Sequence, residues 1–574
     1  MANYSAYMDK VVLFDLASRQ TSVLPWSDED REQCIGGSAM AAKLFESAGA
    51  DSIVITTGPL TGTGAPGSNY FNISAVSPLT GELAHSSCGG SFGLYLKKAG
   101  FDALVIKGSC ESPMWLEIAN DRFTLHKAGS IWGKTVSSTN DYVQETLNEE
   151  RNCRVKCGML AIGAAGENLV GMATVASGEH DACHCTLGAA FGAKKLKAIA
   201  VTGNKDITVF DEAKALENHK QWVADIKAHP LTGKRLPRLG SAGFVERLQE
   251  KGLLATENFS KGGFEFAQEL SGEKFADKYN VVNRGCVYCP IRCERTAMLD
   301  NELVKGPDLD AMVLLGSNIL NSDVKSIIRW KKELHELGLD LSHTARAVAW
   351  AMQARVEGVW KSELEFGKTS NLSETFAAIA LKKGIGEELS EGHVALGKKY
   401  GGDFAYLYGD LAMTAVQSYV GFNGALCDYM NKYMDAALNA GQCPYIALAQ
   451  IPAFMVEKPK GAAAFAARKL APLAPIAAKL ISVLPDSVGD KLPATYLTRE
   501  LRYAVGMRVS LDALVKTATC AESEKLPKPM AEFYKAANAF SIKDCVAHIK
   551  ETAEKISSMD KDDIPVFKLL KGKE

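Results

Sequence analysis

Hydrophobic and polar positions alternate over short distances in the first third of the chain and over helical distances in most of the rest. In the first third, short runs rich in β-branched residues are separated by turns containing glycine, proline, serine or asparagine, and this pattern predicts strands. The clearest runs are "KVVLFDL", "DSIVITTG", "DALVIKG" and "KAIAVTG". The sequence therefore predicts a sheet-rich region over residues 1–203.

From residue 212 onward, apolar residues recur at spacings of three and four, which indicates amphipathic helices. The clearest segments are "EAKALENHKQWVADIKAH", "DVKSIIRWKKELHELG", "SHTARAVAWAMQARVEG" and "NLSETFAAIALKKGIGEELSEG". "SDVK" and "SETF" predict helix starts, whereas Gly338, Gly358 and Gly384 predict helix ends. We therefore expect an α+β protein, with a β-rich domain followed by two mainly helical domains, over residues 1–203, 204–404 and 405–574.

Composition narrows the class of protein. The 574 residues are too many for one hydrophobic core, and a net charge of −2 gives no basic surface for nucleic acid. The apolar segment 459–485 carries lysines, an arginine and internal prolines, so we expect no membrane span. Residues 1–16 lack the apolar run of a secretory signal, which predicts a cytoplasmic protein. Fourteen cysteines in such a compartment favour metal binding over disulfides, and oxygen sensitivity follows.

Three cysteines stand close together in "RGCVYCPIRCERT", residues 284–296, which we expect to form a loop between helices. The spacing Cys-x-x-Cys-x-x-x-Cys of Cys286, Cys289 and Cys293 lets one loop supply three ligands to an iron–sulfur cluster. A fourth ligand must come from a distant segment, and Cys427 and Cys443 are candidates. Spacing alone leaves open a cluster, a zinc site completed by a distant ligand, and a loop with free thiols.

This loop and the following "GPDLDAMVLLGSN" resemble the aldehyde:ferredoxin oxidoreductase family. Further blocks resemble the family in the same order over about residues 8–455: "GPLTGTGAPGSNYFN", "SPLTGELAHSSCGGSFG", "IWGKT", "IGAAGENLV", "LGAAFGAKKLKAIAVTG" and "LGLDLSHTARAVAWAMQ". The resemblance implies a tungsten or molybdenum ion held by two pterins beside a [4Fe–4S] cluster, with magnesium bridging the pterin phosphates. It also implies an aldehyde or related carbonyl substrate and a ferredoxin-like carrier or iron–sulfur subunit as electron partner. A homo-oligomer is a further expectation.

The resemblance also assigns site residues. In the family, the fourth cluster cysteine closes an Asp-x-x-Gly-Leu-Cys motif, and "LNAGQC" places Cys443 there, with Cys427 as the alternative. Asp308 and Asp310 of "GPDLDA" occupy the positions of family carboxylates; Asp310 is the candidate for proton transfer, whereas Asp308 better suits a helix N-cap. Glycine-rich loops, which let backbone N–H groups approach phosphate or form ordinary β-turns, and the two pterin-gripping motifs supply the remaining candidates. These candidate cofactor-binding residues are Gly36, Gly37, Ser38, Tyr70, Phe71, Ser87, Cys88, Gly89, Gly90, Cys183, His184, Cys185, Gly338, Leu339, Asp340 and Gly441.

The chain departs from the family pattern where the pterins are expected. Ser38 and Tyr70 replace arginines, and an arginine fork matches phosphate in a way that serine and tyrosine cannot. The chain also has Ser87 where the family has asparagine, "CHCT" in place of Gly-Arg-Gly-Gly, His335 and Leu438 in place of aspartates, and no histidine between His393 and His548. The segment "EHDACHC" is either metal-binding or packed around a reshaped site.

Two alternatives to the pterin enzyme remain open, and the departures support the first. The first is a divergent relative that has altered or lost the pterin cofactor and acts as an iron–sulfur electron-transfer or scaffolding subunit. The second is a zinc-stabilised binding protein, which only the cysteine loop supports.

Overall fold

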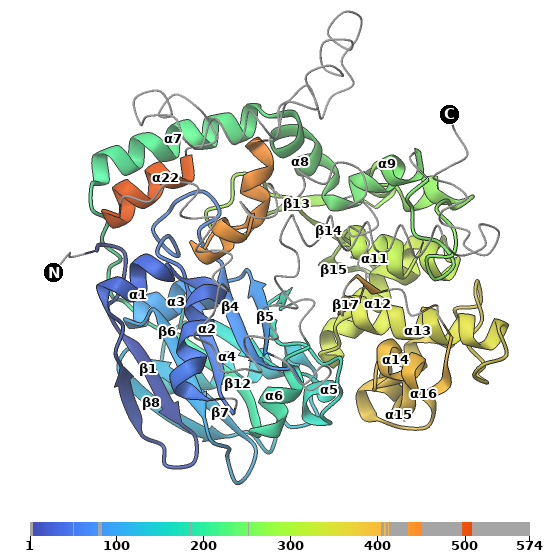
Figure 1. The fold of residues 1–574 in the computed structure, drawn as a ribbon, viewed down its shortest axis with the longest axis horizontal. Helices are drawn as coiled ribbons and strands as arrows, with labels where there is room; N and C mark the ends of the chain where they lie inside the picture. Colours follow the sequence, from blue (N-terminus) through green and yellow to red (C-terminus); the bar gives the residue numbers. More distant parts are fainter. Residues whose placement is uncertain are drawn as a thin grey trace, which may run out of the picture.

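The computed structural model describes residues 4–49, 51–77, 83–182, 186–250, 252–279, 281–402, 404, 407–408, 411–412, 434–450 and 496–507. Within them, a sheet-rich N-terminal part precedes a mainly helical part, which confirms the predicted α+β class (Figure 1). No helix in these ranges is long and apolar enough to cross a lipid bilayer. Four sequence candidates lie outside the described residues, namely Cys183, His184, Cys185 and Cys427.

The N-terminal part contains two six-stranded sheets, ordered β2-β1-β6-β3-β4-β5 and β11-β10-β9-β12-β7-β8. Each is mixed, because β1 pairs with β6 and β12 pairs with β7 in parallel while the other neighbours are antiparallel. The four strand predictions are confirmed as β1, β3, β6 and β12. The bounds are β1 Val11–Asp15, β2 Thr21–Leu24, β3 Ile53–Thr57, β4 Phe71–Val76, β5 Leu83–Cys88, β6 Ala103–Lys107, β7 Met114–Ala119, β8 Arg122–Lys127, β9 Gly158–Ala161, β10 Ala176–Ser177, β11 His180–Asp181 and β12 Leu196–Thr202.

The two sheets face each other across a shared apolar core. Side chains alternate along a strand, so Phe14 of β1 points into this core while Val11 points to the opposite face. The outer faces are covered by α2 (Gly37–Ala48) on the first sheet and α4 (Val136–Arg151) on the second. The inner core also takes in Phe92 of α3 (Phe92–Ala99). These layers form a rigid base for the loops at the sheet edges.

The helical part has a core of its own, through which α13 (Leu341–Val356) runs buried over most of its length. Asp323 caps α12, and Gly338 ends it in a left-handed conformation, as predicted. Gly384 instead precedes α15, because Lys382 adopts the left-handed conformation after α14. The other helices are α1 Asp28–Gln33, α5 Ala164–Glu167, α6 Gly188–Ala193, α7 Glu212–Ala228, α8 Leu236–Leu239, α9 Val245–Glu250, α10 Gly272–Lys278, α11 Leu309–Leu314, α12 Val324–Leu337, α14 Leu372–Leu381, α15 Ile385–Leu389, α16 His393–Tyr400 and α22 Tyr496–Glu500.

A three-stranded antiparallel sheet, β13 (Val282–Arg284), β14 (Glu294–Leu299) and β15 (Glu302–Lys305), interrupts the helices. The expectation of a cysteine loop between helices was wrong, because residues 285–293 connect β13 to β14. Pairing of Arg284 with Glu294 fixes the two ends of this loop next to each other. The sheet thus holds the cysteine loop at a defined place at the end of a ladder.

The turns at residues 338–340 and 440–441 belong to the two pterin-gripping motifs of the family pattern, and they dock on glycine loops of the N-terminal part. At the first, the backbone N–H groups of Thr174 and Asp340 donate to the carbonyl oxygens of Gly338 and Met172, at 2.8 and 2.9 Å. At the second, the N–H of Leu60 donates to the Ala440 carbonyl oxygen at 2.8 Å. A Cβ on Gly58 would overlap the Ala440 backbone, so this contact requires glycine.

Candidate active site

The structure brings Cys286, Cys289, Cys293 and Cys443 together. The loop turns tightly, with the Cys289 N–H donating to the Cys286 carbonyl oxygen at 3.1 Å and Tyr288 at a φ of 59°. Cys443 is buried, and burial together with the three loop cysteines raises the pKa of its thiol well above the usual range. Four thiols from segments about 150 residues apart in the sequence therefore share one site.

The loop of residues 61–68 ties the two cysteine segments to each other. The Gly67 N–H donates to the Tyr288 carbonyl oxygen at 2.7 Å, and the Cys443 N–H donates to the Gly67 carbonyl oxygen at 2.9 Å. A Cβ on Gly67 would lie 3.1 Å from the Cys443 Cβ, so little space remains between loop and thiol. The glycine-rich loop thus holds the cysteine segments together instead of forming a free turn.

Burial disfavours the charged form of the loop thiols. Burial and the Glu294 carboxylate raise the pKa of Cys286 to about 12, and burial and Cys289 raise that of Cys293 to about 12. Free thiols with such pKa values are protonated at neutral pH. A bound metal or cluster stabilises the thiolates and releases those protons.

Tyr70, one of the residues in place of family arginines, reaches the cysteines. It packs among Cys289, Cys293 and Cys443, and its hydroxyl forms a hydrogen bond with Cys443. Burial and the neighbouring cysteines raise the pKa of this phenol well above its usual range, so it is a neutral donor. Tyr70, which stands where the family arginine would bind a pterin phosphate, therefore contacts the cysteine site.

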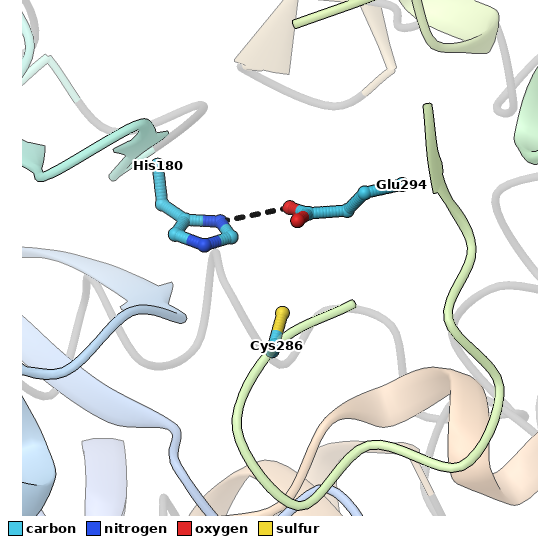
Figure 2. A group of neighbouring side chains, drawn as sticks. All are labelled: His180, Cys286 and Glu294. Carbon is cyan, nitrogen blue, oxygen red and sulfur yellow. Dashed lines mark ion pairs between the residues drawn. The ribbon is translucent and has the colours of Figure 1, made fainter. Parts of the chain in front are cut away.

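Figure 2 shows His180, Cys286 and Glu294 pointing toward one another from β11 and the two ends of the cysteine loop. The His180 Nδ1 lies 3.2 Å from the Glu294 carboxylate, and the three potential ligand atoms lie within 4.8 Å of one another. The Lys305 ammonium is 3.3 Å from the same carboxylate and donates to the Glu179 carbonyl oxygen at 2.9 Å. Because the Lys305 ammonium already neutralises the Glu294 carboxylate, we interpret the three side chains as part of an ion-pair network and not as a cation-binding site.

Burial lowers the pKa of His180 to about 4, so its imidazole is neutral at physiological pH. The sequence singled out His180 but missed Glu294 and Lys305. Glu294 directly follows Cys293, which is a usable signal, whereas nothing local in the sequence marks Lys305.

A second ion pair joins the two parts of the chain next to this network. His335, which replaces a motif aspartate, lies 2.7 Å from the Asp181 carboxylate. Burial opposes both charges, but the pair interaction outweighs burial, lowering the pKa of Asp181 and raising that of His335. The histidine is therefore held by the protein itself, in an ion pair that favours the charged form of both partners.

The two candidate carboxylates differ in their surroundings. Asp308 caps α11, accepting from the Ala311 N–H at 2.9 Å, and pairs with Lys331; although burial opposes its charge, Lys331 lowers the pKa of Asp308. Asp310 lies in the first turn of α11, and its charge acts on the buried phenol of Tyr445. The helix cap and the ion pair with Lys331 support the capping interpretation of Asp308, whose charge, like that of Asp310, raises the pKa of the Tyr445 phenol. The sequence did not single out Tyr445.

The motif turns are also held by side chains. The Asp340 carboxylate accepts from the His343 N–H and contacts its Nδ1, both at 2.9 Å. The amide oxygen of Asn439, which the sequence did not single out, accepts from the Ser38 hydroxyl and the Ala39 N–H, both at 3.1 Å. Gly36 and Gly37 lie against Asn439, with a Cβ on Gly36 placed 2.6 Å from its carbonyl oxygen. Ser38 thus binds the protein at this point.

The candidate cofactor-binding residues at the start of β4 and the end of β5 fall into two groups: some side chains are buried in the core, and others face the candidate site. Phe71 is buried between the sheets, with its ring 5.2 Å from that of Phe92, so its side chain does not reach the site. Ser87 and Cys88 lie on β5 opposite β4, and Cys88 is also part of the core. A Cβ on Gly89 would meet the Tyr70 ring at 3.5 Å and His180 at 3.6 Å.

Polar atoms left without partners test whether a cofactor fits this edge. The side-chain oxygens of Ser68, Asn69, Ser177 and Gln442 are buried and accept or donate no hydrogen bond within the described chain. Asn69 donates to the Gly90 carbonyl oxygen at 3.0 Å, and Ser177 lies against the same glycine. Buried polar groups are nearly always satisfied, so these residues fit a polar ligand with several hydrogen-bonding groups, as a pterin has.

The chain is similar to known proteins over most of its length. The family models described as "Aldehyde ferredoxin oxidoreductase, N-terminal domain" and "domains 2 & 3" match residues 11–203 and 217–519. Tungsten-containing aldehyde ferredoxin oxidoreductases of Pyrococcus furiosus and Thermococcus kodakarensis are 36% and 35% identical over 360 residues, covering 61% of this chain. The matched part spans only 59% of those relatives' own length.

Two further proteins are similar to the chain. An aliphatic sulfonate oxidoreductase, WOR-like subunit, of Pyrococcus furiosus is 25% identical over 422 residues, 67% of this chain and 66% of the relative. The active site complex BamBC of benzoyl coenzyme A reductase shares the fold, with a TM-score of 0.67 and 20% identity over 90% of this chain and 88% of that one. On the two family models, the chain belongs to the aldehyde ferredoxin oxidoreductase family.

Proposed function

We propose that the chain is a cytoplasmic oxidoreductase that moves electrons between a carbonyl-type substrate and a ferredoxin-like partner through a [4Fe–4S] cluster. The ligands of the cluster are Cys286, Cys289, Cys293 and Cys443. The observation that carries this proposal is the convergence of these four buried or half-buried thiols in a chain of this family.

We further propose that tungsten or molybdenum, held by two pterins, is the second centre. The residues that would hold the pterins are the turns at Gly338–Asp340 and Gly441 and the unsatisfied oxygens of Ser68, Asn69 and Ser177. When bound, the metal supplies two-electron chemistry and polarises the substrate carbonyl. Magnesium is a further candidate, because the arginines that neutralise pterin phosphates in the family are absent at Ser38 and Tyr70.

The protein's own residues would orient substrate and move its proton. Asp310 is the proposed acceptor, because its neighbour Asp308 is committed to the helix cap and to Lys331. The neutral imidazole of His180 can hydrogen-bond to a polar group without adding charge beside Cys286. We propose a carbonyl substrate because the family acts on aldehydes. The proposal covers both oxidation of an aldehyde and reduction of another carbonyl compound.

A specific observation favours a second candidate, a relative with an altered or lost pterin that acts as an electron-transfer or scaffolding subunit. Tyr70 contacts Cys443, Ser38 bonds Asn439 and His335 pairs with Asp181. Three of the residues that replace charged family side chains are thus held by contacts within the protein.

Elemental analysis of anaerobically purified protein tests these proposals. About four iron atoms and about one tungsten or molybdenum per chain would support the pterin enzyme. About four iron atoms with neither metal would support the electron-transfer subunit. Zinc without iron would refute both and support a structural zinc site.

A further inference from the structure

The cysteine loop exposes apolar side chains at the molecular surface. Val287 and Tyr288 are each 44% exposed, and Val282 at the start of β13 is 49% exposed. Exposed apolar groups gathered in so short a segment are uncommon unless another molecule covers them. A contact role for this loop would explain why it carries them.

Exposed cations surround these apolar side chains. Arg284 ends β13 and Arg292 lies on the loop, and residues 281–293 contain no aspartate or glutamate. The Arg292 guanidinium donates to the Asn283 carbonyl oxygen at 3.2 Å, and the Asn283 amide donates to the Pro237 carbonyl oxygen at 3.0 Å, which places the segment containing Lys234 and Arg238 beside β13.

The cations of this surface have no ion-pair partner among the described residues. In the described part of the chain, Lys234, Arg238, Arg284 and Arg292 form no ion pair, whereas the neighbouring Arg235 lies 3.7 Å from Glu273. A group of exposed, unpaired cations attracts an acidic partner over a distance comparable to the Debye length.

The same loop carries the thiols that lie nearest to solvent. Cys286, Cys289 and Cys293 are half-buried, whereas Cys443 is buried. A molecule seated on the tip of the loop is therefore separated from the cysteine site by little more than the loop itself.

We propose that this surface, here called the cluster-loop face, is the transient docking site of a small acidic iron–sulfur electron carrier; the face consists of Lys234, Arg238, Arg284, Val287, Tyr288 and Arg292. The inference rests on the cluster of the proposed function. One electron leaves the reduced cluster and reduces the iron centre of the carrier by one electron, and no bond forms or breaks. A small apolar centre with a charged rim matches weak electron-transfer interfaces, whereas permanent interfaces are larger and more apolar.

Charge reversal tests the docking site kinetically. The variant Arg284→Glu/Arg292→Glu is compared with Lys127→Glu/Lys361→Glu, which reverses two exposed lysines elsewhere. At low ionic strength, we expect the rate at which the first variant reduces an acidic ferredoxin to fall by about tenfold or more. The fall should be smaller in high salt, which screens the charges. Reduction of a viologen dye, and both rates of the control, should stay within about twofold. Unchanged ferredoxin reduction, or an equal fall in both rates, would overturn the proposal.

Binding separates this proposal from the proposed function. The affinity of the oxidised acidic ferredoxin for the purified protein, measured at low salt, should weaken about tenfold in the arginine variant and little in the control. Val287→Ser/Tyr288→Ser should weaken binding while leaving its salt dependence unchanged. Binding that depends on these residues in protein lacking iron would refute the cluster and keep the docking site. Absence of binding, or a complex that persists in high salt, would contradict transient docking on this face.

Discussion

The cysteine site and the sheet edge beside it resemble the family to very different degrees. At the cysteine site all four thiols are present and converge, and the loop of residues 61–68 holds both segments by backbone hydrogen bonds. At the sheet edge the arginines are replaced, and Ser38 and Tyr70 bond to the protein. The four-cysteine site is thus kept beside a sheet edge whose side chains depart from the family pattern, and the two regions can be perturbed separately.

The largest effect is expected from Cys443→Ser. A serine hydroxyl is a poor ligand for iron, so the variant should lose most of its iron or retain a three-iron cluster. The visible absorbance and the iron content per chain measure this loss. Cys153→Ser, at an exposed cysteine away from the site, should leave both unchanged. A full [4Fe–4S] spectrum in the Cys443 variant would show that the fourth ligand lies elsewhere.

The next largest effect is expected where the C-terminal motif turn docks. Gly58→Ala places a methyl group onto the Ala440 backbone, which cannot move aside as a flexible side chain can. We expect a loss of about 3 kcal/mol or more in the free energy of unfolding, together with weaker cluster retention. Gly129→Ala, where a Cβ meets nothing within 4 Å, is the matched control and should change stability by less than about 0.5 kcal/mol. Equal melting temperatures for the two variants would contradict the tight docking of this turn.

A smaller, pH-dependent effect is expected from Asp181→Asn. The raised pKa of His335 gives stability that is present below its unfolded pKa and lost as pH rises through the folded pKa. The lowered pKa of Asp181 gives stability that is present above its unfolded pKa and lost as pH falls through the folded one. The pair therefore stabilises most between the ordinary pKa values of the two groups, from about pH 4 to about pH 6.5.

Denaturant unfolding over this pH range measures the contribution of the pair. The free energy of unfolding of the variant should fall by about 1–3 kcal/mol near pH 5.5, a loss limited by the partial exposure of both side chains. The loss should be smaller at alkaline pH, where His335 is no longer charged. His335→Asn should show the same profile. A loss that does not depend on pH would mean that the residues act by packing.

The smallest effect on the fold is expected from Tyr70→Phe, which removes one hydroxyl beside Cys443. The cluster should remain, and stability should fall by about 1 kcal/mol. Because hydrogen bonds to cluster sulfur raise the reduction potential, the variant should require a lower potential for reduction. An anaerobic redox titration measures this shift. An unchanged potential would show that the Tyr70 hydroxyl does not act on the cluster.

Local patterns predicted much of the fold. Runs of β-branched residues between turns predicted β1, β3, β6 and β12. The sequence also predicted α12, because its cap Asp323 and its terminal Gly338 directly flank the helix. The sheet β13–β15 was missed, since its strands are short and rich in charged residues. Gly384 was misassigned because a left-handed lysine, two residues earlier, ends α14.

The site was predicted less completely, because most of its contacts join distant segments. Spacing identified the three loop cysteines, but only the resemblance selected Cys443. The network of His180, Glu294 and Lys305 joins β11 to a segment more than 100 positions later, and nothing local in the sequence marks Lys305. Phe71 was assigned to the site from its motif, yet strand alternation turns it into the core.

Electron paramagnetic resonance of the anaerobically purified, dithionite-reduced protein tests the central claim most directly. The account predicts the signal of a reduced [4Fe–4S] cluster, integrating to about one spin per chain, that disappears in Cys443→Ser. A protein with no such signal, or one whose signal is unaffected by loss of the Cys443 thiol, would contradict it.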